Sequence, residues 1–172
     1  HYMYFEPTAD FSMNTVTTCE NGTVDYTNLS TEEILNYSWE FEGGTPAVSN
    51  DVNPSIDYAN VGTYEVKLTV SNPAGIDSLL LIDTVVVKAN PIMPVVTLVD
   101  GEAIESSSLI NNQWNDVSGL VTGEVNQTFT PSVDGDYTVT VTNSDNCSTE
   151  SVVYSFINSV GIEQYSASEL VV

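Results

Sequence analysis

The sequence predicts an all-β fold made of two β-sandwiches in tandem, and an internal repeat is the main reason. Asn53–Ser71 reads NPSIDYANVGTYEVKLTVS, and a later stretch reads NQTFTPSVDGDYTVTVTNS, so that Tyr64 and Tyr137 fall on the same position of the repeat. A tryptophan strand precedes each copy, NYSWEF around Trp39 and NNQWND around Trp114. The same order therefore occurs twice: a tryptophan strand, a glycine-x-tyrosine step and an alternating strand. This repetition indicates two stacked sandwich modules.

Strand alternation runs along most of the chain, whereas helical periodicity is almost absent. Turn sequences such as Asn21-Gly22 and Gly43-Gly44 separate the alternating runs. In the first half, the predicted strands cover residues 9–13, 24–26, 37–41, 56–58, 64–70 and 76–87. In the second half, they cover residues 95–99, 103–106, 112–115, 128–130, 136–142 and 150–157. Between the halves, KANPIMP (88–94) is predicted to be a stiff linker, because it holds two prolines.

The aromatic residues of the repeat are predicted to form the two cores. Each tyrosine opens a strand just beyond a tight turn, which is the place of a tyrosine corner. Its ring should pack inward while its hydroxyl reaches a nearby backbone group. Trp39 and Tyr64 are therefore predicted core residues of the first sandwich, and Trp114 and Tyr137 of the second.

The charge balance excludes whole classes of function. The chain has 24 acidic residues, two lysines and no arginine, for a formal net charge of −22. Such a field repels polyanions and offers almost no cations to release counterions from phosphates, so nucleic-acid binding is excluded. It should also keep the chain monomeric. No apolar run approaches the roughly 20 residues that a membrane helix needs, so no membrane insertion is predicted.

Catalysis is not predicted either. The single histidine stands at position 1, and Cys19 and Cys147 are far apart, so no Ser-His-Asp, Cys-His or zinc constellation can be assembled. The chain is therefore predicted not to be an enzyme. One cysteine in each half leaves no bridge within a half, and nothing in the sequence requires a bridge between them, so two free thiols are predicted.

Residues 36–72 closely resemble a PKD (polycystic kidney disease) domain. The family pattern is W-D-F-G-D-G, then P-x-x-x-Y, then G-x-Y-x-V-x-L-x-V. The matching residues are Trp39, Phe41, Gly44, Pro54, Tyr58, Gly62, Tyr64, Val66, Leu68 and Val70. The departures are Glu40 for Asp, Glu42 for Gly and Gly43 for Asp. Variants of this kind, followed by Thr-Pro as at Thr45-Pro46, are typical of PKD repeats in the Bacteroidota.

Residues 94–157 resemble the immunoglobulin-like repeat that follows PKD domains in large secreted Bacteroidota proteins, through NQWN and NQTFTPSVDGDYTVTVTNSDNCS. The resemblance implies two tandem immunoglobulin-like β-sandwiches: a PKD domain over 6–88 and an immunoglobulin-like domain over 94–157. Residues 158–172 are then a tail, or a linker to a missing C-terminal segment. Gly161-Ile162-Glu163 is similar to the linker that opens a type IX secretion sorting tail.

Calcium is the one metal ion that the sequence suggests. Calcium-binding relatives of the PKD family take ligands from the N-terminal lead-in and from an acidic loop before the tryptophan strand, which the resemblance places at Glu32 and Glu33. Asp134 and Asp136 flank Gly135 at the turn into the second tyrosine strand, and loop carboxylates suit calcium. The alternative is that all four are solvated loop carboxylates. No other cofactor is expected.

The resemblance implies a non-catalytic extracellular tandem that acts as a spacer or presentation module of a larger secreted or cell-surface protein, such as a hydrolase or an adhesin. Its partners would be the other domains of the same polypeptide. The alternative is a binding module for an extracellular polysaccharide or protein surface. In that case Tyr2, Tyr4 and Phe5 would be the aromatic residues available to grip a ligand.

Overall fold

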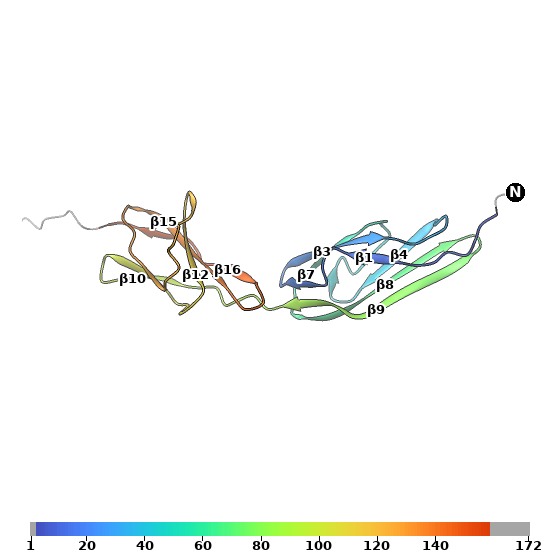
Figure 1. Ribbon diagram of the computed structural model, residues 1–172, viewed down its shortest axis with the longest axis horizontal. Helices are drawn as coiled ribbons and strands as arrows, with labels where there is room; N and C mark the ends of the chain where they lie inside the picture. The colour runs from blue at the N-terminus through green and yellow to red at the C-terminus, as the bar shows by residue number, and fades with distance from the viewer. Residues whose placement is uncertain (1–2, 159–172) are drawn as a thin grey trace, which may run out of the picture. The chain divides into compact units, whose positions relative to one another are not determined.

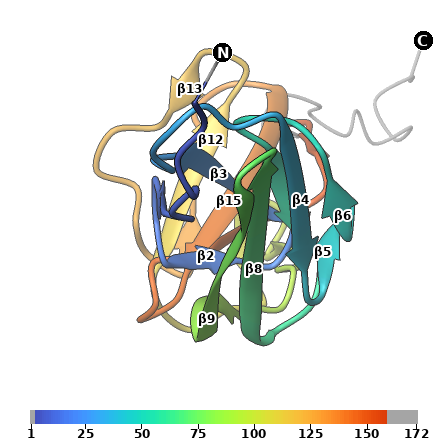
Figure 2. The same ribbon diagram turned by 90° about the vertical axis from the view of Figure 1, so that its right-hand side faces the viewer.

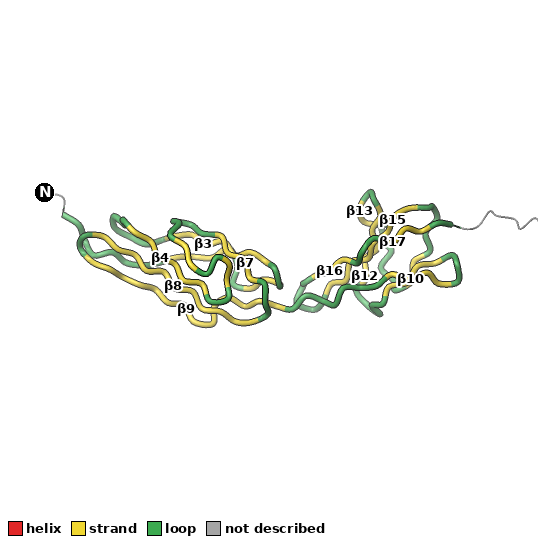
Figure 3. Tube along the Cα trace, turned by 180° about the vertical axis from the view of Figure 1, so that it is seen from behind, coloured by secondary structure: helices red, strands yellow, loops and turns green. Residues whose placement is uncertain are grey.

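The computed structural model describes residues 3–158, and the chain divides into two compact units between Asn90 and Pro91. The described residues form strands, turns and loops, with no helix among them (Figure 3). The predicted all-β fold is therefore confirmed. The predicted tail beyond Asn158 and the aromatic Tyr2 lie outside the described residues.

Two sheets form the first unit (Figure 1). One sheet has four antiparallel strands in the spatial order β1 (Phe11–Met13), β3 (Gly22–Asn28), β7 (Ser55–Tyr58) and β5 (Gly44–Thr45). The other has five strands in the order β2 (Thr17–Cys19), β9 (Gly75–Lys88), β8 (Gly62–Asn72), β4 (Asn36–Phe41) and β6 (Val48–Ser49). Among the described strands of this unit, only β2 and β9 pair in parallel. Figure 2 shows β9, β8 and β4 of this sheet side by side.

The core of the first unit lies between these sheets and is dominated by aromatic rings. Trp39 is fully buried, and its ring centroid lies 5.1 Å from that of Phe11 and 5.7 Å from that of Tyr26, both on the opposite sheet. Phe41 stacks on Trp39 at 5.7 Å. Aromatic contacts of this kind add to the gain from burial alone. Tyr64, predicted as a core residue, is partly buried and packs against the edge of this cluster.

The second unit repeats the arrangement on a smaller scale. One sheet contains β10 (Val96–Val99), β11 (Ala103–Ser106) and β14 (Thr128–Phe129). The other contains β13 (Gly119–Leu120), β12 (Asn112–Asp116), β15 (Gly135–Thr142) and β16 (Ser148–Glu150), while β17 (Tyr154–Phe156) pairs with the first part of β15. Its core is a separate cluster in which Trp114 and Tyr137 are buried, as predicted. With this core, the chain has two tandem β-sandwiches.

The repeat is offset between the tryptophan strand and the tyrosine strand. Trp39 lies opposite Leu68, the fourth residue after the corner tyrosine, whereas Trp114 lies opposite Val139, the second residue after its tyrosine. The place that Trp39 occupies in the first unit is therefore taken by Asn112 in the second. Both indole N–H groups nevertheless donate to the backbone carbonyl twelve residues further on, each at 2.9 Å.

Asn112 makes the second core less apolar than the first. Its side chain is only 3% exposed; Nδ2 donates to the Ser108 carbonyl at 3.1 Å, while Oδ1 has no hydrogen-bond partner. A buried acceptor without a donor costs about 1–3 kcal/mol. The second sandwich therefore pairs a shorter set of strands with an unsatisfied polar group at one end of its core.

Candidate functional site

The corner tyrosine has the same geometry in both units. The Tyr64 hydroxyl donates to the carbonyl of Asn60 at 2.8 Å, and the Tyr137 hydroxyl donates to the carbonyl of Val133 at 3.1 Å. Each bond closes the turn four residues before the tyrosine. The predicted tyrosine corners are therefore confirmed in both units, and their role is structural: they hold the turn that opens the long strand.

Two glycines make room for the Tyr64 ring. Gly43 has a φ of +65°, and a Cβ there would collide with the ring. A Cβ at Gly62 would lie 2.8 Å from Tyr64 Cζ. On its other side the ring stacks on Tyr58 at 5.4 Å. The Gly43-Gly44 step, read from the sequence as a turn, therefore also serves as the seat of the corner tyrosine.

A pair of hydroxyls is enclosed in the first core. Tyr26 Oη and Tyr58 Oη are 2.8 Å apart, and both side chains are buried. Burial raises the pKa of Tyr26 above its ordinary value, and the bond to Tyr58 and the charge of Tyr58 raise it further. Burial likewise raises the pKa of Tyr58, although its bond to Tyr26 acts in the opposite direction. The pair satisfies two polar groups in an apolar core and has no access to a substrate.

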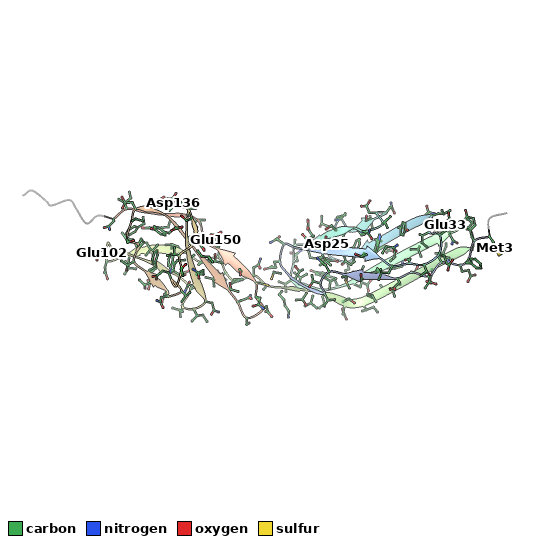
Figure 4. All side chains as sticks on the ribbon, turned by 45° about the horizontal axis from the view of Figure 1, so that its top comes forward. Met3, Asp25, Glu33, Glu102, Asp136 and Glu150 are labelled. Atoms are coloured by element: carbon green, nitrogen blue, oxygen red, sulfur yellow. The ribbon has the colours of Figure 1, made fainter. Side chains whose placement is uncertain are left out.

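The first pair of predicted calcium ligands lies in the loop before β4, beside the N-terminal lead-in. The loop before β4 meets the N-terminal lead-in through an isolated bridge between Thr8 and Thr31, with Thr31 N donating to Thr8 O at 3.1 Å. Glu32 follows with a φ of +69°, and Glu33 is exposed at the same end of the unit as Met3 (Figure 4). Neither carboxylate has a hydrogen-bond partner that fixes its direction toward a common point.

The second pair of predicted calcium ligands is already engaged by protein donors. Asp134 Oδ1 accepts from the backbone N–H of Asn158 at 2.6 Å, and Asp136 Oδ1 accepts from the Ser155 hydroxyl at 2.6 Å. These bonds fasten the segment around β17 to the turn into β15. Within residues 3–158, no group of three or more His, Cys, Asp or Glu side chains is placed to hold a metal ion. Glu32 and Glu33 belong to the first unit, and Asp134 and Asp136 to the second.

An acidic groove crosses the second unit next to this turn. Its lining includes Asp116, Asp136, Thr138 and Glu150, and the last two are joined by a hydrogen bond of 2.5 Å (Figure 4 labels Asp136 and Glu150). Burial raises the pKa of Tyr137, and the nearby negative charges of Asp116 and Asp134 raise it as well. Three carboxylates, those of Asp116, Asp136 and Glu150, make this groove acidic.

The aromatic residues near the N-terminus are accessible. Phe5 is exposed and its carbonyl accepts from Asn72 Nδ2 at 2.8 Å, which holds this segment against the turn between β8 and β9. Tyr4 is half-buried. These are the described aromatic side chains that a ligand could contact at this end of the first unit.

The prediction of two free thiols is wrong. Cys19 and Cys147 are both disulfide-bonded, and the described residues contain no free cysteine. The sequence argument excluded a bridge within either half and found nothing that required one between the halves, but a missing requirement does not exclude a disulfide. Disulfides persist in oxidising surroundings such as the extracellular space and the periplasm.

The fold and these geometries define a class: an all-β protein of two sandwiches, each with a buried tryptophan, a corner tyrosine and its own core. Residues 5–87 match the sequence model of the PKD domain family, so the matched segment lies within the first unit and runs from the exposed Phe5 to Val87 in β9. No curated protein matches the chain. Among the described residues, no helix is long and apolar enough to cross a membrane.

Several solved structures are similar to this chain. The PKD1 domain of the Vibrio cholerae metalloprotease PrtV is 27% identical, with a TM-score of 0.40, over 49% of this chain and 99% of that one. A carbohydrate-binding module of the β-sandwich superfamily is 19% identical, with a TM-score of 0.44, over 79% of this chain and 54% of that one. Titin domains Z1Z2 in complex with telethonin are 13% identical, with a TM-score of 0.41, over 87% and 95%.

Proposed function

We propose that this chain is a non-catalytic extracellular tandem that spaces or presents another domain of a larger secreted or cell-surface protein. The match of residues 5–87 to the PKD domain family carries the proposal. The polar groups of the candidate sites support the proposal, because their hydrogen bonds stabilise the fold. The corner tyrosines close turns, and Asp134 and Asp136 accept hydrogen bonds from backbone and hydroxyl donors.

The extracellular setting rests on the cysteines and the charge. Both cysteines are disulfide-bonded, as expected outside the reducing cytosol. A formal net charge of −22 keeps a protein soluble and discourages self-association. The variant of the PKD pattern around Glu40, Glu42 and Gly43 favours a secreted multidomain protein of the Bacteroidota as the parent. A hydrolase or an adhesin is the kind of protein that such a tandem would serve.

A binding module for an extracellular polysaccharide or protein is the second candidate, favoured by the exposed Phe5 beside Tyr4. Aromatic rings exposed at one end of a sandwich can stack on a sugar or pack against an apolar side chain. In this function Phe5 would provide most of the contact, because its ring is the more exposed of the two.

Retention on insoluble ligands separates the two candidates. The intact chain is incubated with chitin, cellulose and collagen, with a Phe5→Ala variant as the control and with peptide and glycoside substrates added in parallel. A spacer should remain in the supernatant and release no product. Retention that Phe5→Ala abolishes would replace the spacer by the binding module, and product formation by the pure chain would contradict both.

A further inference from the structure

One strand of the first unit leaves a long edge uncovered. The strands at the other sheet edges have two to four residues each, namely β1, β2, β5, β6, β10, β13, β14, β16 and β17. In contrast, β9 has 14 residues, and β2 pairs only with Val86, Val87 and Lys88 at its end. Along the rest of β9, from Ile76 to Asp83, no strand of the described chain pairs with the outer edge; Figure 1 shows β9 running along the margin of the unit.

The register determines which backbone groups face outward. The carbonyl of Ser71 accepts from Leu35 N at 3.0 Å, so Ser71 faces β4. Successive residues of a strand direct their backbone groups to opposite sides, so Val70 faces β9 and bonds with its partner Asp77. The residues of β9 between those bonded to β8 then turn N–H and C=O outward: Ile76, Ser78 and Leu80.

The side chains of this edge are apolar and unprotected. Ile76, Leu80 and Ile82 are 73%, 45% and 66% exposed. Neither a lysine nor a proline occurs between Gly75 and Val87, although proteins commonly use these residues to block an exposed edge. Only the bulge at Asp83, where φ is +50° and the pairing with β8 shifts, interrupts the edge. The outer edge of β9 therefore has unpaired backbone groups with which another strand can pair.

The charges around this edge indicate the partner. Glu6 lies beside Gly75 at one end, with its Cγ 3.6 Å from the position of a Cβ there, and Asp83 lies exposed at the other end. The nearby cation Lys67 is already paired with Glu40 at 2.8 Å. A second copy of this chain would bring the same net charge of −22, so like-charge repulsion opposes pairing between copies.

We propose that the outer edge of β9, from Ile76 to Ile82, binds an extended basic segment of another protein by strand addition. Main-chain hydrogen bonds to Ile76, Ser78 and Leu80 would provide affinity, as in other cases of strand addition. Alternate apolar side chains of the partner would cover the exposed isoleucines and leucine. Lysine or arginine at the two ends of a nine-residue extended segment, roughly 26 Å apart, would meet Glu6 and Asp83. This partner is additional to the spacer function and does not depend on it.

A designed peptide tests the chemistry. The probe is a labelled, acetylated nonapeptide, KVTVTVTVK, titrated with the intact chain and followed by fluorescence anisotropy. Two analogues control for charge and for backbone pairing: EVTVTVTVE and KVTPTPTVK. We expect the first peptide to bind at least about tenfold more tightly than either analogue. Equal binding of the acidic peptide, or equal binding of the proline peptide, which cannot complete the ladder, would overturn the proposal.

A matched pair of variants locates the site. Ile82 on β9 and Val48 on β6 are both 66% exposed and lie on opposite edges of the same sheet. Ile82→Lys should weaken binding of KVTVTVTVK by about tenfold, because it places a like charge on the edge, while Val48→Lys should change it less than about twofold. Equal effects of the two substitutions would mean that the peptide responds only to net charge, and the proposal would fail.

Hydrogen exchange gives a readout at the level of single amides. In the free protein, the amides of Ile76, Ser78 and Leu80 should exchange quickly, while those of the neighbouring Leu79 and Leu81 are protected by β8. Saturating KVTVTVTVK should slow the first three by at least about tenfold. Binding that leaves all three unchanged would place the peptide elsewhere and contradict strand addition.

Discussion

The tyrosines are the residues on which the two sandwiches depend most visibly. Tyr64 and Tyr137 could be assigned from the sequence because a corner tyrosine follows a turn and a glycine at a fixed spacing. The Tyr26–Tyr58 hydroxyl pair could not, because it joins residues of adjacent strands whose order the sequence does not give. Pairwise contacts across a sandwich follow from strand order, which local patterns leave open.

The enclosed tyrosine pair predicts a loss of stability at alkaline pH. The folded-state pKa values of Tyr26 and Tyr58 lie above the unfolded value of 10.0. Above pH 10 the folded state therefore keeps protons that the unfolded state releases. The contribution of the pair to the free energy of unfolding is fully present below pH 10 and is lost as the pH rises above 10. We expect the melting temperature of the first unit to fall above pH 10, and Tyr26→Phe to flatten that fall, with Tyr4→Phe as the control. An identical pH profile in the two variants would contradict this account.

The four carboxylates predicted as calcium ligands allow a direct measurement. Because Asp134 and Asp136 already accept hydrogen bonds, we expect millimolar calcium to raise the melting temperatures no more than sodium at equal ionic strength. A bound ion would add stability by linkage beyond this screening effect. An extra rise with calcium that Glu32→Gln or Asp136→Asn removes would instead establish a site.

At the scale of the element, long alternating strands were predictable and short ones were not. The run from Ile76 to Val87 forms β9, whereas β5, β6 and β13 have two residues each and leave no periodicity to detect. The predicted strand at 150–157 is broken in the structure. Ser151 interrupts it by exchanging hydrogen bonds with Val139, through its backbone N–H at 2.9 Å and its Oγ at 3.0 Å.

The offset of the second tryptophan strand also could not be predicted from the sequence. The repeat suggested that Trp114 is the counterpart of Trp39, but the pairing with β15 gives that place to Asn112. A shift by two residues keeps the same side chains facing the core, so the alternation pattern cannot distinguish the two registers. For the candidate site, the sequence predicted which loops carry the carboxylates. It did not predict which donors form hydrogen bonds with Asp134 and Asp136.

The turn between β4 and β5 provides a prediction for this scale. Gly43→Ala would bring a Cβ into the Tyr64 ring at a φ of +65°, and it should cost about 2 kcal/mol or more of unfolding free energy. Gly75→Ala is the matched control, since its nearest neighbour is Glu6 Cγ at 3.6 Å, and it should change stability by less than about 0.5 kcal/mol. Urea unfolding of both variants checks the difference; equal costs would mean that the ring is not seated on Gly43.

At the scale of the whole molecule, the chain combines two separate cores with a large excess of negative charge. Asn90 is tied to the first unit, where its backbone N–H donates to Glu20 Oε2 at 2.8 Å. Pro91 is tied to the second unit, where its carbonyl accepts from the Thr149 hydroxyl at 2.8 Å. The N-terminal part of the predicted KANPIMP linker therefore belongs to the first unit, and its C-terminal part belongs to the second.

The cysteines supply a prediction about the intact chain. In denaturant without a reductant, we expect no thiol to react with Ellman's reagent, because both cysteines are disulfide-bonded. After reduction, both cysteines of the chain should react. Two reactive thiols before reduction would restore the sequence-based expectation and remove the redox argument for an extracellular protein.

The central claim is that two self-contained sandwiches form this module, and calorimetry of the intact chain tests it most directly. We expect two unfolding transitions. Tyr64→Phe should lower only one of them and Tyr137→Phe only the other, because each substitution removes the hydrogen bond that closes one corner, at about 0.5–1.5 kcal/mol. A single cooperative transition that both substitutions lower equally would contradict the account.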